Sequence, residues 1–205
     1  MTGEDLKNKF NTAYDEDYSG YFSDTQLQRI CDTSLNNLYE RKLEEYAADD
    51  KITDEIMPFT STVSVTPTAG NIVDISPTSS VVPNYKKLIN ARATYQVNTN
   101  IYRKQARELK MLEKYNFYAG DVRYPRYEKN DNQLIIHPTT VSCTNVLLDY
   151  ITLPTPIDIT DNVTDLPYTN KFLEALVVEM KIEASRVNRE VEALQINNQE
   201  QIQNP

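Results

Sequence analysis

Acidic side chains that could bind a metal ion gather in one short segment of the chain, between residues 154 and 165. Asp158, Asp161 and Asp165 occur there, and carboxylate oxygens are the ligands that Ca²⁺ prefers in proteins. A calcium-binding EF-hand loop also needs ligands at regular positions and a glycine at its sharp turn, and this segment has neither. We therefore expect no metal site in the chain.

The residues that could support catalysis are equally sparse. His137 is the single histidine, which excludes a site with several histidine ligands, and its place before Pro138 at a predicted strand end indicates a structural role. Glu40, Glu44 and Glu45 lie among basic residues on a predicted helix, as an ordinary exposed face would. The sequence lacks a nucleotide-binding glycine loop and a Gly-x-Ser-x-Gly motif. We expect no catalytic residues, no cofactor and no enzymatic activity.

Composition narrows the possible partners. The 205 residues carry a formal net charge of −9, which disfavours non-specific binding to nucleic acid phosphates. Such a surface would suit a channel through which DNA slides without sticking, or it would simply keep the protein soluble. Cys31 and Cys143 stand apart and are predicted to be reduced packing residues of a cytosolic protein. We find neither a signal peptide nor an apolar run of about 18 residues, so we expect no membrane partner.

The N-terminal part is predicted to be an arm followed by a helix. Residues 1–22 are polar and acidic, which indicates an extended arm that orders against a partner or packs weakly on its own chain. Ser23 and Gln26 have the spacing of a capping box, which predicts a helix start. Apolar residues at helical spacing follow: Leu27, Ile30, Cys31, Leu35, Leu38, Leu43 and Tyr46.

The middle of the chain has the composition of β-strands. β-Branched and aromatic residues recur there, with a Pro- and Gly-containing turn at 67–71, although helix is a competing interpretation for residues 85–92. The predicted strands span 59–66, 72–75 and 88–97.

Two further apolar runs, 134–136 and 146–153, are predicted to form strands that pair with each other. A polar turn precedes the first run. Each run is followed by a proline, Pro138 or Pro154, which cannot donate a backbone hydrogen bond to a sheet and so ends the strand.

Residues 103–115 have the composition of a helix and the strongest local positive charge on the chain. Arg, Lys, Glu, Ala, Leu and Met all have high helix propensity, so we predict a helix here. Its Arg and Lys side chains could face an acidic surface of a partner, or they could form an ordinary solvated helix face.

A long C-terminal helix is predicted to open at Pro167, which fits its first turn, and to continue through Phe172 to Leu194. Its apolar residues, spaced alternately by four and three, form a heptad seam that either packs on the N-terminal helix or docks its distal half on another subunit. The seam includes Ala184, and its candidate interaction residues are Leu173, Val177, Met180, Val187, Val191 and Leu194. Residues 196–205, rich in Gln and Asn, are predicted to be a flexible tail.

The predicted fold class is therefore α+β. The N-terminal and C-terminal helices pack together, and a small antiparallel β-sheet or sandwich is inserted between them. We predict one domain over residues 23–195, with the β-rich insertion at about 59–153.

The order of these elements resembles the head-to-tail adaptor, or neck ring, proteins of tailed bacteriophages, most of all those of short-tailed and crAss-like phages. The resemblance covers roughly residues 20 to 195. The segments that carry it are Ile56-Met57-Pro58-Phe59, Val82-Pro83-Asn84-Tyr85, Tyr124-Pro125-Arg126-Tyr127, Leu134-Ile135-Ile136-His137-Pro138, Tyr150-Ile151-Thr152-Leu153-Pro154 and Leu166-Pro167.

The resemblance implies a virion protein that forms a homo-oligomeric ring, commonly dodecameric, in the neck between capsid and tail. Such a ring binds the portal protein, joins the next neck or tail ring, and lets DNA pass without specific binding. It is assembled in the host cytoplasm, and its C-terminal helix and tail contact the portal. The alternatives are another neck or tail component, such as a second ring, tail hub or fibre-joining protein, or a cytosolic interaction protein that uses the heptad seam.

Overall fold

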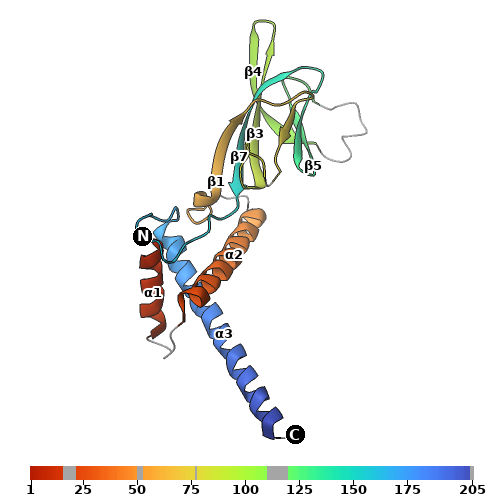
Figure 1. Ribbon diagram of the computed structural model, residues 1–205. Coiled ribbons are helices and arrows are strands. Elements are labelled where there is room, and N and C mark those ends of the chain that lie inside the picture. The colour runs from red at the N-terminus through yellow and green to blue at the C-terminus, as the bar shows by residue number, and fades with distance from the viewer. Residues whose placement is uncertain (16–21, 50–52, 77, 110–119, 204–205) are drawn as a thin grey trace. The chain divides into compact units, whose positions relative to one another are not determined.

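The computed structural model describes residues 1–15, 22–49, 53–76, 78–109 and 120–203, and from Glu190 onward it describes the backbone only (Figure 1). These residues form an α+β protein, which confirms the predicted class. The elements are α1 (Gly3–Asp15), α2 (Asp24–Asp49), the 3-10 helix η1 (Met57–Phe59), β1 (Thr60–Val65), β2 (Ile72–Asp74), β3 (Tyr85–Val97), β4 (Asn100–Glu108), β5 (Arg126–Asn130), β6 (Gln133–His137), β7 (Cys143–Thr152) and α3 (Asn170–Gln203).

The chain divides into two compact units, where the sequence predicted one domain with an insertion. The helical unit comprises Met1–Pro58 and Pro154–Pro205, and the β unit comprises Phe59–Leu153. Each unit has its own buried side chains, and each is described by itself below.

The first helix, α1, lies where an extended arm over residues 1–22 was expected. Leu6, Phe10 and Tyr14 follow one another at a spacing of four residues and are all buried, and α1 packs against α3. The prediction of an extended arm is therefore wrong for Gly3–Asp15. The segment is polar on average, but three large apolar side chains on one face are enough to fix the helix on the unit.

Both N-terminal helices begin with a capping box, in which a side chain and a backbone amide exchange hydrogen bonds. In α1, the Asp5 amide donates to Thr2 Oγ1 at 3.2 Å and the Thr2 amide donates to the Asp5 carboxylate at 2.9 Å. In α2, the Ser23 amide donates to Gln26 Oε1 at 2.9 Å and the Gln26 amide donates to Ser23 Oγ at 3.4 Å. The predicted start of α2 is confirmed.

Replacing Ser23 with alanine should lower the free energy of unfolding of the helical unit by about 1 kcal/mol, because the capping hydroxyl is lost. Chemical denaturation followed by circular dichroism measures the change. Thr25→Ala is the matched control, since Thr25 is exposed on the same turn, and an equal loss in both variants would contradict the capping role.

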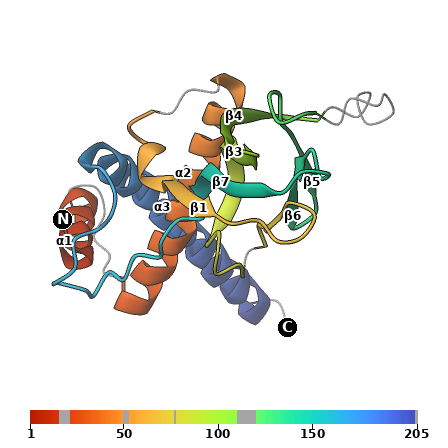
Figure 2. The ribbon, with the colours of Figure 1, turned by 90° about the horizontal axis from the view of Figure 1, so that it is seen from above.

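The apolar stripe predicted for α2 is buried along its length, and α2 crosses α3 in both views (Figures 1 and 2). The packing of the N-terminal helix on the C-terminal helix therefore agrees with the sequence prediction. Burial of each large side chain in this contact contributes on the order of 1.5–3 kcal/mol.

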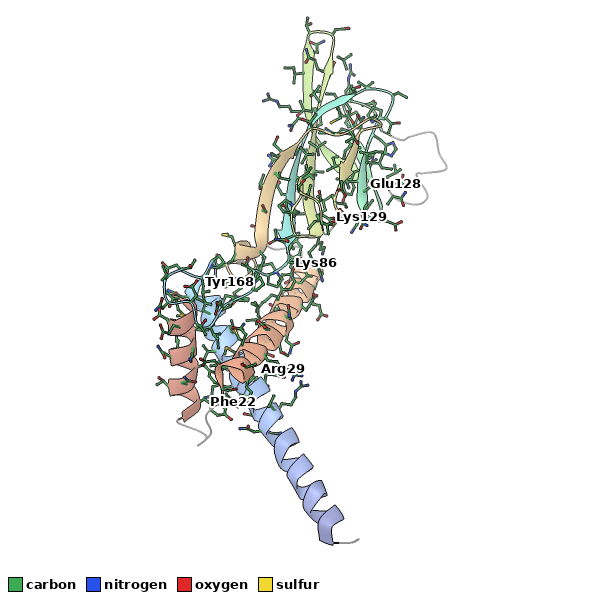
Figure 3. The ribbon with its side chains drawn as sticks, in the orientation of Figure 1. Phe22, Arg29, Lys86, Glu128, Lys129 and Tyr168 are labelled. Atoms are coloured by element: carbon green, nitrogen blue, oxygen red, sulfur yellow. The ribbon has the colours of Figure 1, made fainter. Side chains whose placement is uncertain are left out.

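The start of α3 differs from the prediction that Pro167 occupies its first turn. The helix begins at Asn170, and Thr169 caps it, because its Oγ1 accepts a hydrogen bond from the Phe172 amide at 3.3 Å. Pro167 instead belongs to the connector that precedes the helix. Tyr168, labelled in Figure 3, is buried there and donates its hydroxyl hydrogen to a backbone carbonyl of the same connector.

Glu55 joins three parts of the helical unit through two ion pairs. Its carboxylate lies 2.7 Å from Lys42 Nζ on α2 and 2.9 Å from Lys171 Nζ on α3, and its side chain is only 14% exposed. The hydrogen bonds from Lys42 and then from Lys171 lower the pKa of the Glu55 carboxyl. A carboxyl with a lowered pKa stabilises the folded state above its unfolded pKa of about 4.3, and this stabilisation is lost as the pH falls through the folded pKa.

We expect Glu55→Gln to lower the free energy of unfolding by roughly 1–2 kcal/mol at neutral pH, after allowance for solvent screening. The difference from the wild type should shrink as the pH falls below about 4, because the wild-type carboxyl is then protonated as well. Denaturation curves across this range measure it. Glu45→Gln is the control, since Glu45 also pairs with Lys42 but is 55% exposed, and a pH-independent difference for Glu55→Gln would contradict the account.

The β unit is a single curled sheet of seven strands in the described residues, in the order β1-β7-β3-β4-β5-β6-β2. The sheet curls around one apolar core to which both halves contribute (Figure 2). All neighbouring pairs are antiparallel except β4 and β5, which pair in parallel through two residues. The small antiparallel sheet that was predicted is thus larger than expected and contains one parallel junction.

The strands predicted at 134–136 and 146–153 are present as β6 and β7, but they do not pair with each other. β6 pairs with β5 and β2, whereas β7 pairs with β1 and β3. The prediction of this pairing was wrong because the short connection between them leads from one half of the curled sheet to the other.

The basic segment predicted to be a helix over 103–115 is β-structure as far as it is described. Residues 103–108 belong to β4, which pairs with β3 in the register Tyr95↔Tyr102 and Ala91↔Ala106. Ala106 is buried in the core, so strand pairing and burial outweigh the helix propensity of the neighbouring Arg, Lys and Gln residues. The rest of the predicted helix, 110–115, lies outside the described residues. The competing helix at 85–92 is also ruled out, since these residues are in β3.

The turn before β2 is fixed by a buried asparagine, Asn71, with φ of 58°. Its side-chain amide donates to the carbonyls of Pro138 and Val141, both at 2.8 Å, and its Oδ1 accepts from the Cys143 amide at 2.8 Å. Its own carbonyl accepts from the Ile136 amide at 3.0 Å. Asn71 therefore holds the connection between β6 and β7 against the turn that precedes β2.

Candidate interaction surfaces

The first half of the predicted heptad seam is part of the core of the helical unit. Leu173, Val177, Met180 and Ala184 are buried, and α3 contacts both α1 and α2. This burial agrees with the interpretation in which the seam packs on the helices of its own chain. These four side chains are not available to a partner while the unit is folded.

The second half of the seam lies near or beyond the limit of the described side chains. Val187 is partly buried and lines a hollow of about 230 Å³ between α2 and α3. Val191 and Leu194 belong to α3, but their side chains lie outside the described ones. The backbone of α3 is helical to Gln203, where a flexible tail over 196–205 was expected. Docking of this half on another subunit stays a prediction.

A second apolar pair on α3 was missed in the sequence. Val178 and Ile182 lie one turn apart on the same face, and they are 58% and 59% exposed. The sequence does place them four residues apart in the predicted C-terminal helix, but neither is a position of the heptad seam. Exposed aliphatic neighbours of this kind can contribute to a contact with another protein.

The two units differ sharply in charge. By sequence, the β unit contains 11 Lys and Arg against 7 Asp and Glu, a net charge of +4. The rest of the chain, which forms the helical unit, contains 10 Lys and Arg against 23 Asp and Glu, a net charge of −13. The net charge of −9 therefore hides a basic unit and a strongly acidic one.

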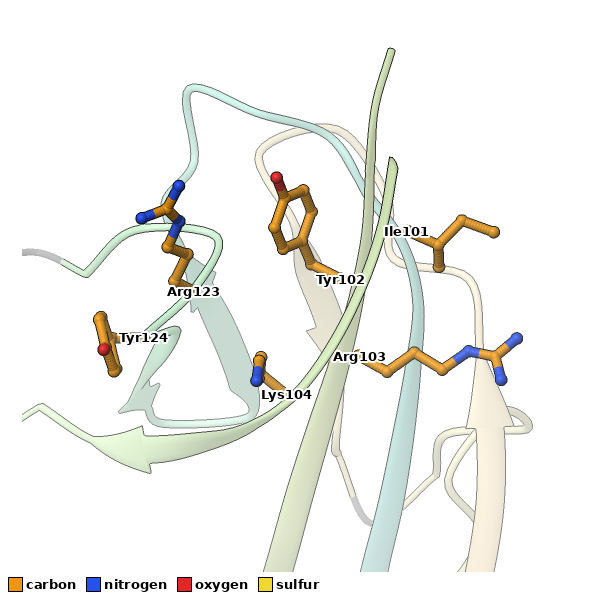
Figure 4. Close-up of a pocket in the computed structure, with 6 residues that line it drawn as sticks. All are labelled: Ile101, Tyr102, Arg103, Lys104, Arg123 and Tyr124. Carbon is orange, nitrogen blue, oxygen red and sulfur yellow. The ribbon is translucent and has the colours of Figure 1, made fainter. Parts of the chain in front are cut away.

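Four exposed cations make up what we call the basic surface of the β unit: Arg103, Lys104, Arg107 and Arg123. Three come from β4, and Arg123 comes from the turn before β5, which a bridge between Asp121 and Tyr124 closes. Figure 4 shows Lys104 on the same side of β4 as Arg123, and Arg103 on the opposite side. The cations thus surround the strand rather than forming a flat patch.

Exposed apolar and aromatic side chains lie between these cations. Ile101 is 60% exposed and Tyr124 is 73% exposed. With Tyr102 and three of the cations they line an open hollow of about 760 Å³ (Figure 4). Aromatic residues and Arg beside each other are common where proteins contact one another.

Acidic side chains among the described residues of the β unit do not pair with the basic surface. Arg92, on the neighbouring strand β3, pairs with Asp149 at 3.2 Å. In contrast, none of the four cations of the basic surface forms an ion pair with a described residue. The prediction that Arg and Lys near 103 could face an acidic partner stays open, although they lie on a strand and not on a helix. Arg123 was missed because it is far from β4 in the sequence.

The edge of β4 beside this surface is also unpaired over part of its length. β4 pairs with β3 from Asn100 to Ala106, but with β5 only at Arg107 and Glu108. Charged side chains on such an edge can either protect it from other strands or attract a partner of opposite charge.

Asp158 and Asp161 of the connector have local structural roles, whereas Asp165 pairs with the N-terminal amine of Met1 at 2.8 Å. A hydrogen bond from the Thr160 hydroxyl, followed by one from the Thr160 amide, lowers the pKa of the Asp158 carboxyl. The amides of Val163 and Thr164 lower the pKa of the Asp161 carboxyl in the same way. These are turn-capping contacts. No group of three or more His, Cys, Asp or Glu side chains that could hold a metal occurs among the described residues.

The remaining candidates for chemistry are packed into the two units. Cys31 and Cys143 are free and buried, and burial raises the pKa of the Cys31 thiol to about 12. His137 is partly buried at the end of β6, with its Nε2 3.8 Å from Glu128 on the paired strand β5. A thiol that stays protonated is a poor nucleophile, so Cys31 has the character of a packing residue.

Comparison with known proteins finds no matching family: no protein-family model matches the chain, and no curated protein is detectably similar to it. None of the helices within the described residues has the length and hydropathy needed to cross a membrane.

Proposed function

We propose that this protein is a virion structural protein, a head-to-tail adaptor of a tailed bacteriophage. It forms a ring, commonly dodecameric in such proteins, that joins the portal to the next neck or tail ring and continues the DNA channel. The proposal starts from the order of helices, strands and proline-bounded segments, in which the chain resembles these adaptors. The role is structural rather than catalytic.

The observation that supports the proposal is that one chain carries a different candidate contact surface on each of its two units. The basic surface of the β unit has no ion-pair partner among the described residues, and Val178 and Ile182 are exposed on α3 of the helical unit. A ring subunit touches two neighbours through two different patches and needs further surface for the rings above and below it.

The charge of the chain is compatible with a channel for DNA. The helical unit has a net charge of −13, which would repel a phosphate backbone and let DNA slide without sticking. Under this proposal DNA passes through the ring without specific binding, and assembly takes place in the host cytoplasm.

Mass spectrometry of purified virions tests the proposal. We expect the protein in particles, at a copy number comparable to that of the portal protein and far below that of the capsid protein. Its absence from washed particles would contradict the proposal and favour a cytosolic interaction protein. A copy number far from that of the portal would favour another virion component.

A further inference from the structure

The basic surface of the β unit offers positive charge to a partner at several points. Arg103, Lys104, Arg107 and Arg123 are exposed and unpaired with described residues, and Tyr102 and Tyr124 lie between them (Figure 4). Like charges on one strand and one turn repel one another weakly in water, and an acidic surface opposite them would replace this repulsion with attraction.

A surface rich in acidic side chains occurs at the C-terminal end of α2. Glu44, Glu45 and Asp49 are exposed there, and no basic residue lies in the last turn of the helix. The C-terminal end of a helix already carries partial negative charge, so acidic side chains at this end are unfavourable in the isolated chain. Only Glu45 has a cationic partner, Lys42 at 2.8 Å, whereas Glu44 and Asp49 form no ion pair with a described residue. Cations from outside would relieve this repulsion.

We propose that the basic surface of one copy docks on the acidic end of α2 of a second copy. Both surfaces are present once in every chain, so the partner is always available in equal number. Since the two surfaces are different, the contact is heterologous and repeats from copy to copy. That this repetition closes into a ring rests on the proposed function, but the contact itself does not.

A second copy fits the charges better than a nucleic acid does. A nucleic acid that approached the basic surface would also meet a chain with a net charge of −9, whose helical unit carries −13. That same excess of negative charge is what attracts the basic surface of another copy. The exposed side chains of Ile101 and Tyr124, with the partly buried Tyr102 beside them, add apolar area of the kind found at protein contacts.

A charge exchange between two variants tests this contact. The first variant carries Lys104→Glu and Arg123→Glu, and the second carries Glu44→Lys and Asp49→Lys. Each alone places like charges in the contact, so we expect its self-association constant to fall by at least about tenfold relative to the wild type. In a mixture, the reversed surface of the first variant meets the reversed α2 end of the second, and the two unchanged surfaces meet each other. Both contacts then join opposite charges, and association should return. Sedimentation velocity over a concentration series measures all three samples at low and high salt.

The control variant carries Lys9→Glu and Lys129→Glu. It changes the net charge of the chain by the same amount as the first variant, but at two exposed positions outside both surfaces. We expect its association to stay within about twofold of the wild type, and added salt to weaken the wild-type association. Circular dichroism confirms that every variant is folded.

Three results would overturn the inference. In the first, the wild type stays monomeric throughout, or the mixed variants fail to associate. In the second, Lys104→Ala with Arg123→Ala increases association, which would show that these cations keep other strands away from the edge of β4 in the wild type. In the third, the wild type binds a double-stranded DNA oligonucleotide, and Lys104→Glu with Arg123→Glu abolishes this binding but leaves self-association unchanged. If the exchange succeeds but the protein is absent from virions, the contact stands and the proposed function fails.

Discussion

Replacing Asn71 with alanine is expected to lower the free energy of unfolding of the β unit by about 3–5 kcal/mol. The side chain is buried and makes three hydrogen bonds to backbone groups of Pro138, Val141 and Cys143. Alanine would leave these groups without partners, and each unsatisfied buried group costs about 1–3 kcal/mol. Alanine would also have to adopt the positive φ of 58°, which Asn tolerates better than most residues. Urea denaturation measures the loss.

Two further variants separate the causes. Asn98 has nearly the same φ, 57°, but is exposed in the turn between β3 and β4, so Asn98→Ala should cost only about 1 kcal/mol. Asn71→Gly removes the side-chain hydrogen bonds, but glycine adopts the positive φ without strain. Its loss in free energy of unfolding should therefore lie between those of Asn71→Ala and Asn98→Ala. The role of Asn71 as a hydrogen-bonded anchor would be contradicted by an Asn71→Ala variant no less stable than Asn98→Ala.

Phe10→Ala is expected to lower the free energy of unfolding of the helical unit by about 3–5 kcal/mol, because buried apolar surface is lost and a cavity remains. Phe10 is fully buried, and its ring stacks on Tyr14 with centroids 5.3 Å apart and lies 6.5 Å from the ring of Phe22. Hydrogen exchange should show the amides of α1 losing protection well before those of α2.

The matched control for this variant is Asn8→Ala, an exposed position in the same helix that should change stability by less than about 0.5 kcal/mol. If Phe10→Ala were as stable as Asn8→Ala, α1 would be dispensable to the unit. The first residues would then behave as the arm that the sequence predicted.

Local rules predicted much of this fold. The capping box at Ser23 and Gln26 marked the start of α2, and the prolines after β6 and β7 marked strand ends, because each signal depends only on neighbouring residues. The start of α1 carried a similar signal in Thr2 and Asp5. It was missed because the acidic composition of the segment was given more weight than its spacing.

Long-range pairing accounts for the errors. The composition of 103–108 favours a helix, and only its register with β3 makes it a strand. In the same way, β6 and β7 are neighbours in the sequence but belong to different halves of the curled sheet. No local pattern contains this information.

The surfaces were the least predictable part. The seam could be recognised from its heptad spacing, yet the sequence could not say that Leu173, Val177 and Met180 are buried within their own unit. The basic surface joins β4 to Arg123, which only the folded sheet brings together. Net charge averaged over the whole chain also concealed the opposite charges of the two units.

Electron microscopy of the virion, or of this protein co-expressed with the portal protein, tests the central claim most directly. The proposed function predicts a ring of copies of this chain at the neck, bound to the portal and coaxial with the DNA channel. Density for the chain elsewhere in the particle, or a portal that binds no ring of it, would contradict the proposal.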